Sequence, residues 1–223
     1  MLRKSMTVIL GIVASAGLAL GQQTSTPAAA AAAAPRRAPS PGGTAATQVG
    51  GTWSAPNKDG ERQYENGKWI EVTYSRPILK GRTNIFGSGA DYGKAVNDGA
   101  PVWRAGANLT TRLRTEVPIV LGNKTLAPGE YSLFVDLKES GWTLIVSNQP
   151  MQEKYDPNEK AKTFGAYNYD PKYDIVRVPM KMVAPQVSID QFTIAFVDML
   201  EKGGKLAMAW EKTGAVVPFA VVP

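Results

Sequence analysis

The stretch GEYSLFVDLK, residues 129–138, decides the fold class of this chain. Apolar and polar side chains alternate along it with a period of two, and the single break is Phe134, which stands among the polar residues. The apolar set is Tyr131, Leu133, Val135 and Leu137. Such alternation puts one set of side chains on a core face and the other set outside, so the stretch is predicted to be a half-buried β-strand.

The same alternation returns along much of the chain. It occurs in residues 69–74, 109–114, 176–182, 192–196 and 206–210. No stretch of 12 residues carries a helical stripe of apolar side chains. The sequence therefore predicts an all-β fold: one domain built as an antiparallel β-sandwich or a partly closed, jelly-roll-like barrel.

Glycine and proline indicate where the strands turn or end. Gly122-Asn123 suits a two-residue hairpin with glycine first, and Gly203-Gly204 is predicted to separate two further strands. Pro179 lies inside an alternating run and cannot donate a ladder hydrogen bond. We therefore expect its strand to lie at a sheet edge or to contain a bulge.

The N-terminus has the layout of a secretory signal peptide. Basic residues at Arg3 and Lys4 precede an apolar run from Met6 to Leu20, which ends in the small-residue signal Ala19-Leu20-Gly21. An uncleaved membrane anchor is the alternative, but a bilayer crossing needs about 20 apolar residues. We expect cleavage after Gly21 and export to the periplasm or the cell exterior, with no membrane span in the mature chain.

Composition divides the remaining chain into two segments. Residues 22–50 are rich in Ala and Pro and contain nothing that can form a core, so they are predicted to be a disordered linker. Residues 51–223 are predicted to be the single β-sandwich domain. These residues carry 21 basic and 19 acidic side chains, so the high isoelectric point of the whole chain does not indicate nucleic-acid binding.

The chain contains no histidine and no cysteine. This removes Ser-His-Asp and Cys-His catalysis, histidine-ligated zinc and thiol chemistry. The acidic stretch around Asp156 lacks the ligand spacing and central glycine of a calcium-binding EF-hand. We expect no metal site and no cofactor, and any chemistry must come from carboxylate, Lys, Tyr, Ser/Thr or Arg side chains.

A set of basic and amide side chains is the predicted binding site. Its members are Arg76, Lys80, Arg82, Arg104 and Asn108. A guanidinium group offers a planar fork of donors that matches a carboxylate or a phosphate. The set therefore predicts a basic rim for a small anionic ligand, a glycan or a partner protein, on a module that is not an enzyme.

A structural role for the same arginines is the competing interpretation. In it, each arginine pairs with an internal carboxylate such as Glu130, Asp136 or Asp174 and fastens a loop to the sheet. Arg104 is its clearest example, because Trp103 beside it offers a large apolar side chain for packing and Gly106 allows a close backbone approach.

A hydrolase acting on an extracytoplasmic substrate such as a glycan is the alternative function. It would use Glu130 and Asp136 as its carboxylate pair, with Tyr74 or an arginine as the electrophile. Catalytic carboxylates of glycosidases lie roughly 5 to 9.5 Å apart, so the distance between these two side chains distinguishes the hypotheses.

Several motifs along the chain stand in the order typical of one protein family. They are Tyr74-Ser75-Arg76-Pro77, Lys80-Gly81-Arg82, Ile85-Phe86-Gly87, Trp103–Asn108, Leu126–Phe134, Phe164-Gly165-Ala166, Asp174–Val178 and Trp210-Glu211. On these motifs the chain is similar, over about residues 51–221, to the domain of unknown function 2911 family of exported bacterial proteins. The resemblance implies a β-rich fold and export and supplies no activity. Phe164 departs from the family pattern, which often has tryptophan there.

Overall fold

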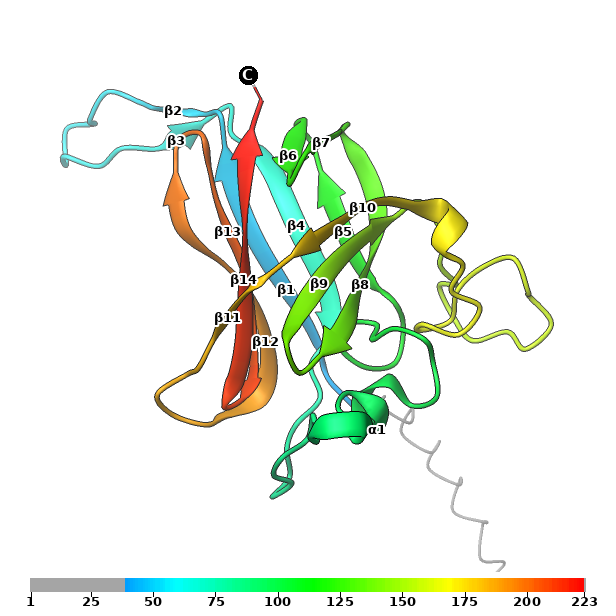
Figure 1. The fold of residues 1–223 in the computed structure, drawn as a ribbon. Helices are drawn as coiled ribbons and strands as arrows, with labels where there is room; N and C mark the ends of the chain where they lie inside the picture. Colours follow the sequence, from blue (N-terminus) through cyan, green and yellow to red (C-terminus); the bar gives the residue numbers. More distant parts are fainter. Residues whose placement is uncertain (1–38, 223) are drawn as a thin grey trace, which may run out of the picture. The chain divides into compact units, whose positions relative to one another are not determined.

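Two antiparallel β-sheets packed face to face form the fold in the computed structural model, which describes residues 39–222 (Figure 1). Of the two expected forms of an all-β fold, the chain adopts the sandwich. The first sheet runs in the order β1 (Gly42–Val49), β4 (Lys68–Ser75), β5 (Thr111–Thr115), β8 (Gly129–Lys138), β9 (Gly141–Ser147) and β10 (Asp174–Pro179).

The second sheet contains the C-terminal strands. Its order is β12 (Ile189–Leu200), β13 (Gly203–Glu211), β14 (Thr213–Val221), β6 (Ile119–Leu121) and β7 (Lys124–Leu126), and β11 (Lys181–Val183) also pairs with β14. A separate hairpin joins β2 (Thr52–Trp53) to β3 (Tyr64–Glu65). The helical segments are η1 (Gly89–Asp91), α1 (Lys94–Asn97) and η2 (Pro171–Tyr173).

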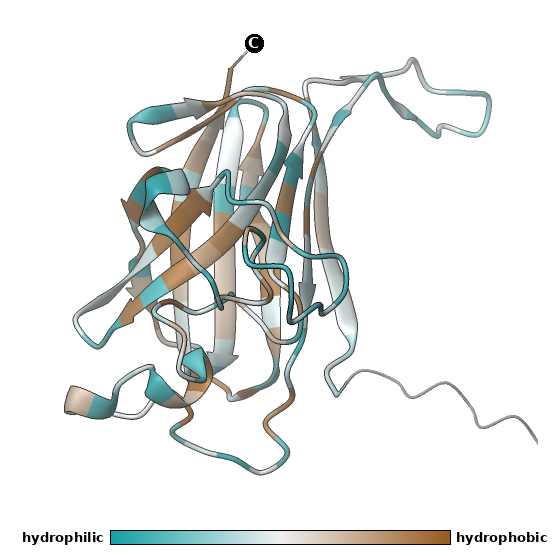
Figure 2. Cartoon of the chain, turned by 90° about the vertical axis from the view of Figure 1, so that its right-hand side faces the viewer, coloured by the Kyte–Doolittle hydropathy of each residue, from teal (hydrophilic) through white to brown (hydrophobic). Residues whose placement is uncertain are grey.

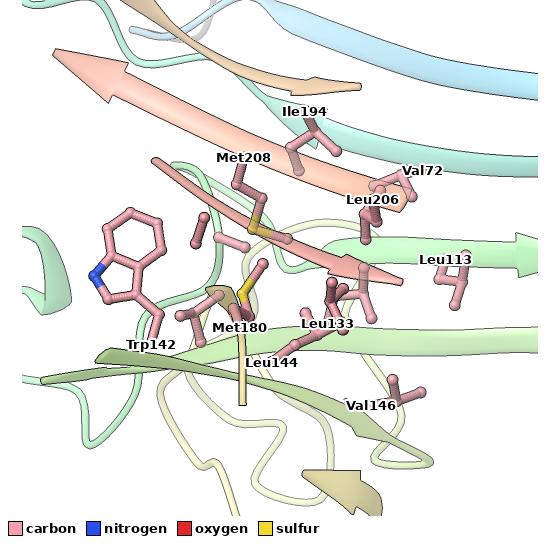
Figure 3. Packing of buried hydrophobic residues seen from close by; sticks show 14 of the residues in the cluster. Val72, Leu113, Leu133, Trp142, Leu144, Val146, Met180, Ile194, Leu206 and Met208 are labelled. Atoms are coloured by element: carbon pink, nitrogen blue, oxygen red, sulfur yellow. The ribbon is translucent and has the colours of Figure 1, made fainter. Parts of the chain in front are cut away.

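The alternating stretch that indicated the fold lies inside the first sheet. It forms β8, where Leu133 pairs with Thr111 of β5 on one side and Val146 of β9 on the other. The apolar set of β8 enters a core between the sheets, and Figure 3 shows Leu133 and Leu144 facing Leu206 and Met208 of the second sheet. All four of these side chains are buried.

The turn signals have mixed outcomes. Gly122-Asn123 joins β6 to β7 with Gly122 at φ 58°, as predicted for the hairpin. Pro179 ends β10, which is an edge strand, and after Met180 the chain continues as β11 in the other sheet. Gly203-Gly204 differs from its prediction, because these residues begin β13 and the turn lies at Glu201-Lys202.

Phe134, the exception among the polar residues, marks a second buried cluster on the outer face of the first sheet. Its ring has no exposed surface and lies 5.1 Å from the ring of Tyr169. Long loops cover this part of the sheet, and Figure 2 shows the strands and loops coloured by hydropathy. The buried members are Ala100, Val102, Phe134, Ile145 and Ala166.

The predicted boundary between linker and domain is wrong by one strand. Residues 42–49 form β1, which pairs along its whole length with β4 and buries Ala45 and Val49. The small residues of β1 pair at the edge of the sheet, where few large side chains are needed. The predicted signal peptide and the first part of the predicted linker lie outside residues 39–222, within which no helix is long and apolar enough to cross a membrane.

Candidate functional site

Two long loops meet over the outer face of the first sheet, where Ala100 and Val102 of one and Ala166 of the other pack with Phe134 and Ile145. Residues 76–110 connect β4 to β5, and residues 148–173 connect β9 to β10. The hydroxyl of Thr110 donates to the carbonyl oxygen of Gly165, and the hydroxyl of Tyr167 lies 2.7 Å from Oδ2 of Asp98. The hydrogen bond to Asp98 raises the pKa of Tyr167 above its ordinary value. Loops of this length usually have a functional role.

Trp103 fastens the first loop to the core. Its backbone N–H donates to the carbonyl oxygen of Val135 and its carbonyl oxygen accepts from the N–H of Val135, both at 2.8 Å. The indole is 1% exposed and its Nε1 donates to the carbonyl oxygen of Gly106 at 3.1 Å. The expected packing of Trp103 on the sheet is therefore present. Four aromatic rings surround it, those of Phe86, Trp142, Phe192 and Trp210.

The backbone after Trp103 adopts a conformation that L-residues rarely take. Ala105 has φ 50° and is fully buried, and Gly106 has φ 149°. A Cβ on Gly106 would lie 2.6 Å from the carbonyl oxygen of Ser75, so the close approach inferred from the sequence is real. The hydroxyl of Thr111 donates to the carbonyl oxygen of Ala105 at 2.8 Å and supports this corner.

Arg104 points out of this corner and joins the two loops. Its Nη1 donates to the carbonyl oxygen of Asn108 at 3.1 Å, and its guanidinium carbon lies 5.6 Å from the centre of the Tyr167 ring. Its Nη2 lies 3.6 Å from Oδ2 of Asp98. The Arg104 side chain is 12% exposed, whereas that of Asp98 is 71% exposed. Arg104 therefore has a carboxylate partner, but a solvated one, and not one of the three carboxylates named from the sequence.

Two members of the predicted rim are held by internal hydrogen bonds. Arg76 donates through Nε to the carbonyl oxygen of Phe192 and through Nη2 to the hydroxyl of Thr193, both at 3.2 Å, so it connects the two sheets. The side-chain amide of Asn108 donates to the carbonyl oxygen of Ser40 at 3.1 Å. Both side chains therefore have a structural role, because they connect parts of the fold that are distant in sequence.

Arg82 and Lys80 lie on the exposed side of the same loop. Arg82 donates through Nε to the carbonyl oxygen of Leu79 at 3.0 Å and through Nη2 to that of Ile78 at 2.9 Å. Its guanidinium carbon lies 5.6 Å from the centre of the Trp210 ring. Among residues 39–222, Lys80 has no side-chain ion pair.

Arg82 and Arg104 line one cavity of about 250 Å³. The structure thus brings two of the five predicted site residues to a shared space. We call this space the rim cavity. Its lining also includes Asp98, Trp103 and Trp210. Two guanidinium groups beside apolar walls can hold an anionic group that carries a small carbon skeleton.

The sequence interpretation missed Asp98 and the part that Trp210 plays at the rim cavity. Trp210 reaches the rim from β13, far along the chain, and only the fold brings it beside Arg82. Its neighbour Glu211 holds the same loop, because its carboxylate accepts from the backbone N–H groups of Asn84 at 2.6 Å and Ile85 at 3.1 Å. In the sequence, the signal that this segment contributes to the rim was the Trp210-Glu211 motif.

The carboxylates of the hydrolase alternative do not converge. Glu130 and Asp136 lie six residues apart on β8, which corresponds to about 20 Å along an extended strand. Each already has an arginine partner: Glu130 lies 3.5 Å from Arg112, and Asp136 lies 2.9 Å from Arg177. The separation exceeds the roughly 5 to 9.5 Å of glycosidase pairs.

Tyr74 is equally unsuited to the role of electrophile. Its ring is 8% exposed, and its hydroxyl accepts from the N–H of Ile194 at 2.9 Å. It joins the two sheets inside the core. Within the described residues, no three acidic side chains stand close enough together to hold a metal ion.

A larger hollow of about 460 Å³ lies over the outer face of β5 and β8. Its lining carries three basic side chains, Arg112, Lys154 and Lys162, and four acidic ones. This near balance gives no preference for an anion, and Arg112 is already paired with Glu130. The rim cavity therefore remains the better candidate for the predicted anionic ligand.

Comparison with known proteins gives a family and no activity. A family model described as protein of unknown function (DUF2911) matches residues 55–219. Neither the curated proteins nor the solved structures contain a match to the chain.

Proposed function

Because the chain belongs to the DUF2911 family, whose description states no activity, we propose a function from its own surface. In this proposal the protein is an exported, non-catalytic binding module. It holds a small ligand that carries a carboxylate or a phosphate group in the rim cavity. The single observation that carries the proposal is that Arg82 and Arg104 line the same cavity.

The free donors of these arginines support anion binding. Arg82 uses Nε and Nη2 for backbone carbonyl oxygens, which fixes the plane of its guanidinium group. Among the described hydrogen bonds, none uses Nη1 of Arg82. Asp98, the one carboxylate among the described residues that line the cavity, is 71% exposed and lies 3.6 Å from Arg104, so this solvated ion pair competes only weakly with a bound anion.

The volume and the lining of the rim cavity limit the size and the chemical class of its ligand. Its volume of about 250 Å³ lies below the roughly 300–1,000 Å³ of sites for drug-sized molecules. Pro77 and Val96 supply apolar wall beside the cations, and the Trp210 ring lies next to the Arg82 guanidinium group. This combination favours a small organic acid or organic phosphate.

The proposal that the module is not catalytic rests on the positions of its carboxylates. Glu130 and Asp136 are too far apart for a shared substrate and are each paired with an arginine. The chain also lacks histidine and cysteine. Binding without chemistry is therefore the function that these side chains support best.

Addition of the ligand should stabilise the protein. We expect inorganic phosphate, or a member of a panel of mono- and dicarboxylates, to raise the melting temperature saturably at constant ionic strength. A ligand at 100 times its Kd adds about 2.7 kcal/mol. For a domain of this size that corresponds to roughly 5–11 °C, measured by differential scanning fluorimetry.

A pair of variants separates site binding from general salt effects, since phosphate and sulfate also stabilise proteins by exclusion from their surface. Arg82→Gln should remove the saturable shift. Arg62→Gln, which changes an exposed arginine on the β2–β3 hairpin, should retain it. An equal shift in both variants would show that the rim cavity does not bind the anion.

Export is tested separately from ligand binding. The basic start, the apolar run and Ala19-Leu20-Gly21 support cleavage after Gly21. Sequencing the N-terminus of protein recovered outside the cytoplasm should therefore give Gln22. Recovery of an intact Met1 from the membrane fraction would contradict the proposal.

A further inference from the structure

The β2–β3 hairpin carries a pair of aromatic side chains, exposed Trp53 and half-buried Tyr64, at the end of the sandwich opposite α1 (Figure 1). Trp53 is 64% exposed, and its ring lies 5.2 Å from that of Tyr64 at an angle of 59°. Exposed apolar side chains that gather on one part of a soluble domain mark interaction sites more often than single ones do. Neither residue is part of the rim cavity.

The aromatic pair is held in place by its surroundings. The hydroxyl of Tyr64 accepts from the backbone N–H of Gly51 at 2.8 Å. A Cβ on Gly51 or on Gly67 would lie 2.7 Å from the Tyr64 ring, so both glycines make room for it. The ring beside Trp53 is therefore ordered before any ligand arrives, which reduces the entropy lost on binding.

A cleft of about 700 Å³ separates this pair from the end of β12. We call it the hairpin cleft. Its other wall is formed by Met199, Leu200 and Glu201, and Leu200 is 77% exposed. The remaining polar side chains that line it are Gln48 and Thr52, and no lysine or arginine of residues 39–222 lines it.

We propose that the hairpin cleft binds a neutral saccharide. A pyranose ring presents an apolar C–H face and a rim of hydroxyl groups, and both have partners here. The C–H face matches the exposed indole of Trp53, while the hydroxyls match the amide of Gln48, the hydroxyl of Thr52 and the carboxylate of Glu201. The volume lies within the range for sites that take small ligands.

The lining disfavours the other classes of occupant. An anionic ligand would meet Glu201 and no cation. A lipid or a wholly apolar partner surface would bury Gln48, Thr52 and Glu201 without hydrogen-bond partners, which is unfavourable. A polyol satisfies the polar groups and the apolar groups together.

Saccharide binding is tested with a panel of neutral oligosaccharides. Cellohexaose, chitohexaose and maltohexaose are titrated against the mature protein, and binding is followed by calorimetry and tryptophan fluorescence. We expect saturable binding of at least one of them. Trp53→Ala should weaken this binding by about tenfold or more, since a tryptophan at the centre of a contact carries much of the affinity.

A second tryptophan provides the matched control. Trp69 is 42% exposed and does not line the hairpin cleft, so Trp69→Ala should leave the affinity unchanged. Arg82→Gln should also bind the saccharide normally, which separates this proposal from the anion site. Failure of all three oligosaccharides up to millimolar concentrations, or equal loss in both tryptophan variants, would overturn the proposal. Self-association that Trp53→Ala abolishes, without saccharide binding, would replace the saccharide with a second copy of the chain.

Discussion

Replacing Trp103 with alanine should lower the free energy of unfolding by about 3–5 kcal/mol, the usual cost of truncating a buried tryptophan or phenylalanine. The indole is 1% exposed, and its centre lies 4.8 Å from that of Phe192 and 5.8 Å from those of Phe86 and Trp142. Its Nε1 also donates to the carbonyl oxygen of Gly106. Alanine loses the aromatic contacts and leaves that acceptor without its donor.

The melting temperature of Trp103→Ala should fall by roughly 6–20 °C, taking about 2–4 °C per kcal/mol. Urea unfolding of the same variant gives the free energy directly. The control is Trp53→Ala, because Trp53 is 64% exposed and its removal should change stability by no more than about 0.5 kcal/mol. Equal effects of the two substitutions would contradict the placement of Trp103 in the core.

The sequence predicted the sheets best where only one face is buried. Along β4 the side chains of Ile70, Val72 and Tyr74 are buried in the core, whereas Thr73 is exposed and Glu71 is half-buried, so the period of two is visible. The pattern fails in β9, where consecutive residues from Leu144 to Val146 are all buried. The loops that cover the outer face of this strand remove the alternation, and the sequence of the strand alone does not show that cover.

β1 was missed for the opposite reason. Its sequence, Gly42–Val49, consists mostly of small and polar residues, and its three β-branched residues do not form an alternating apolar pattern. It forms a strand because β4 offers a ready hydrogen-bonding edge, and eight residue pairs join the two strands. Pairing of this kind depends on tertiary structure, which composition does not reveal.

The candidate site was predicted only in part for a similar reason. Arginines near one another in the sequence suggested a common rim, and Arg82 and Arg104 do share a cavity. Arg76 instead reaches across to Phe192 and Thr193 of β12. Contacts between residues more than 100 positions apart decide which arginine remains available, and no local pattern encodes them.

A substitution of Arg104 distinguishes its two proposed roles, which are to hold the two loops together and to bind the ligand. If an arginine is fastened to a buried carboxylate, its removal leaves an unpaired buried charge and costs roughly 3–5 kcal/mol. Asp98 is 71% exposed, so water solvates it when Arg104 is removed and this penalty does not apply. The alanine variant instead loses the charged hydrogen bond from Arg104 to Asn108 and the contact of Arg104 with the Tyr167 ring.

Arg104→Ala should therefore destabilise the protein by about 2–4 kcal/mol, since a hydrogen bond from a charged donor contributes about 1.5–3 kcal/mol and a cation–π contact about 0.5–1 kcal/mol. The melting temperature should fall by roughly 4–16 °C. Lys80→Ala, on the exposed part of the same loop, should stay within about 0.5 kcal/mol of the unchanged protein. A melting curve of Arg104→Ala that overlays this control would show that Arg104 does not hold the two loops together. Its closeness to the rim cavity would then have to be explained by ligand binding alone.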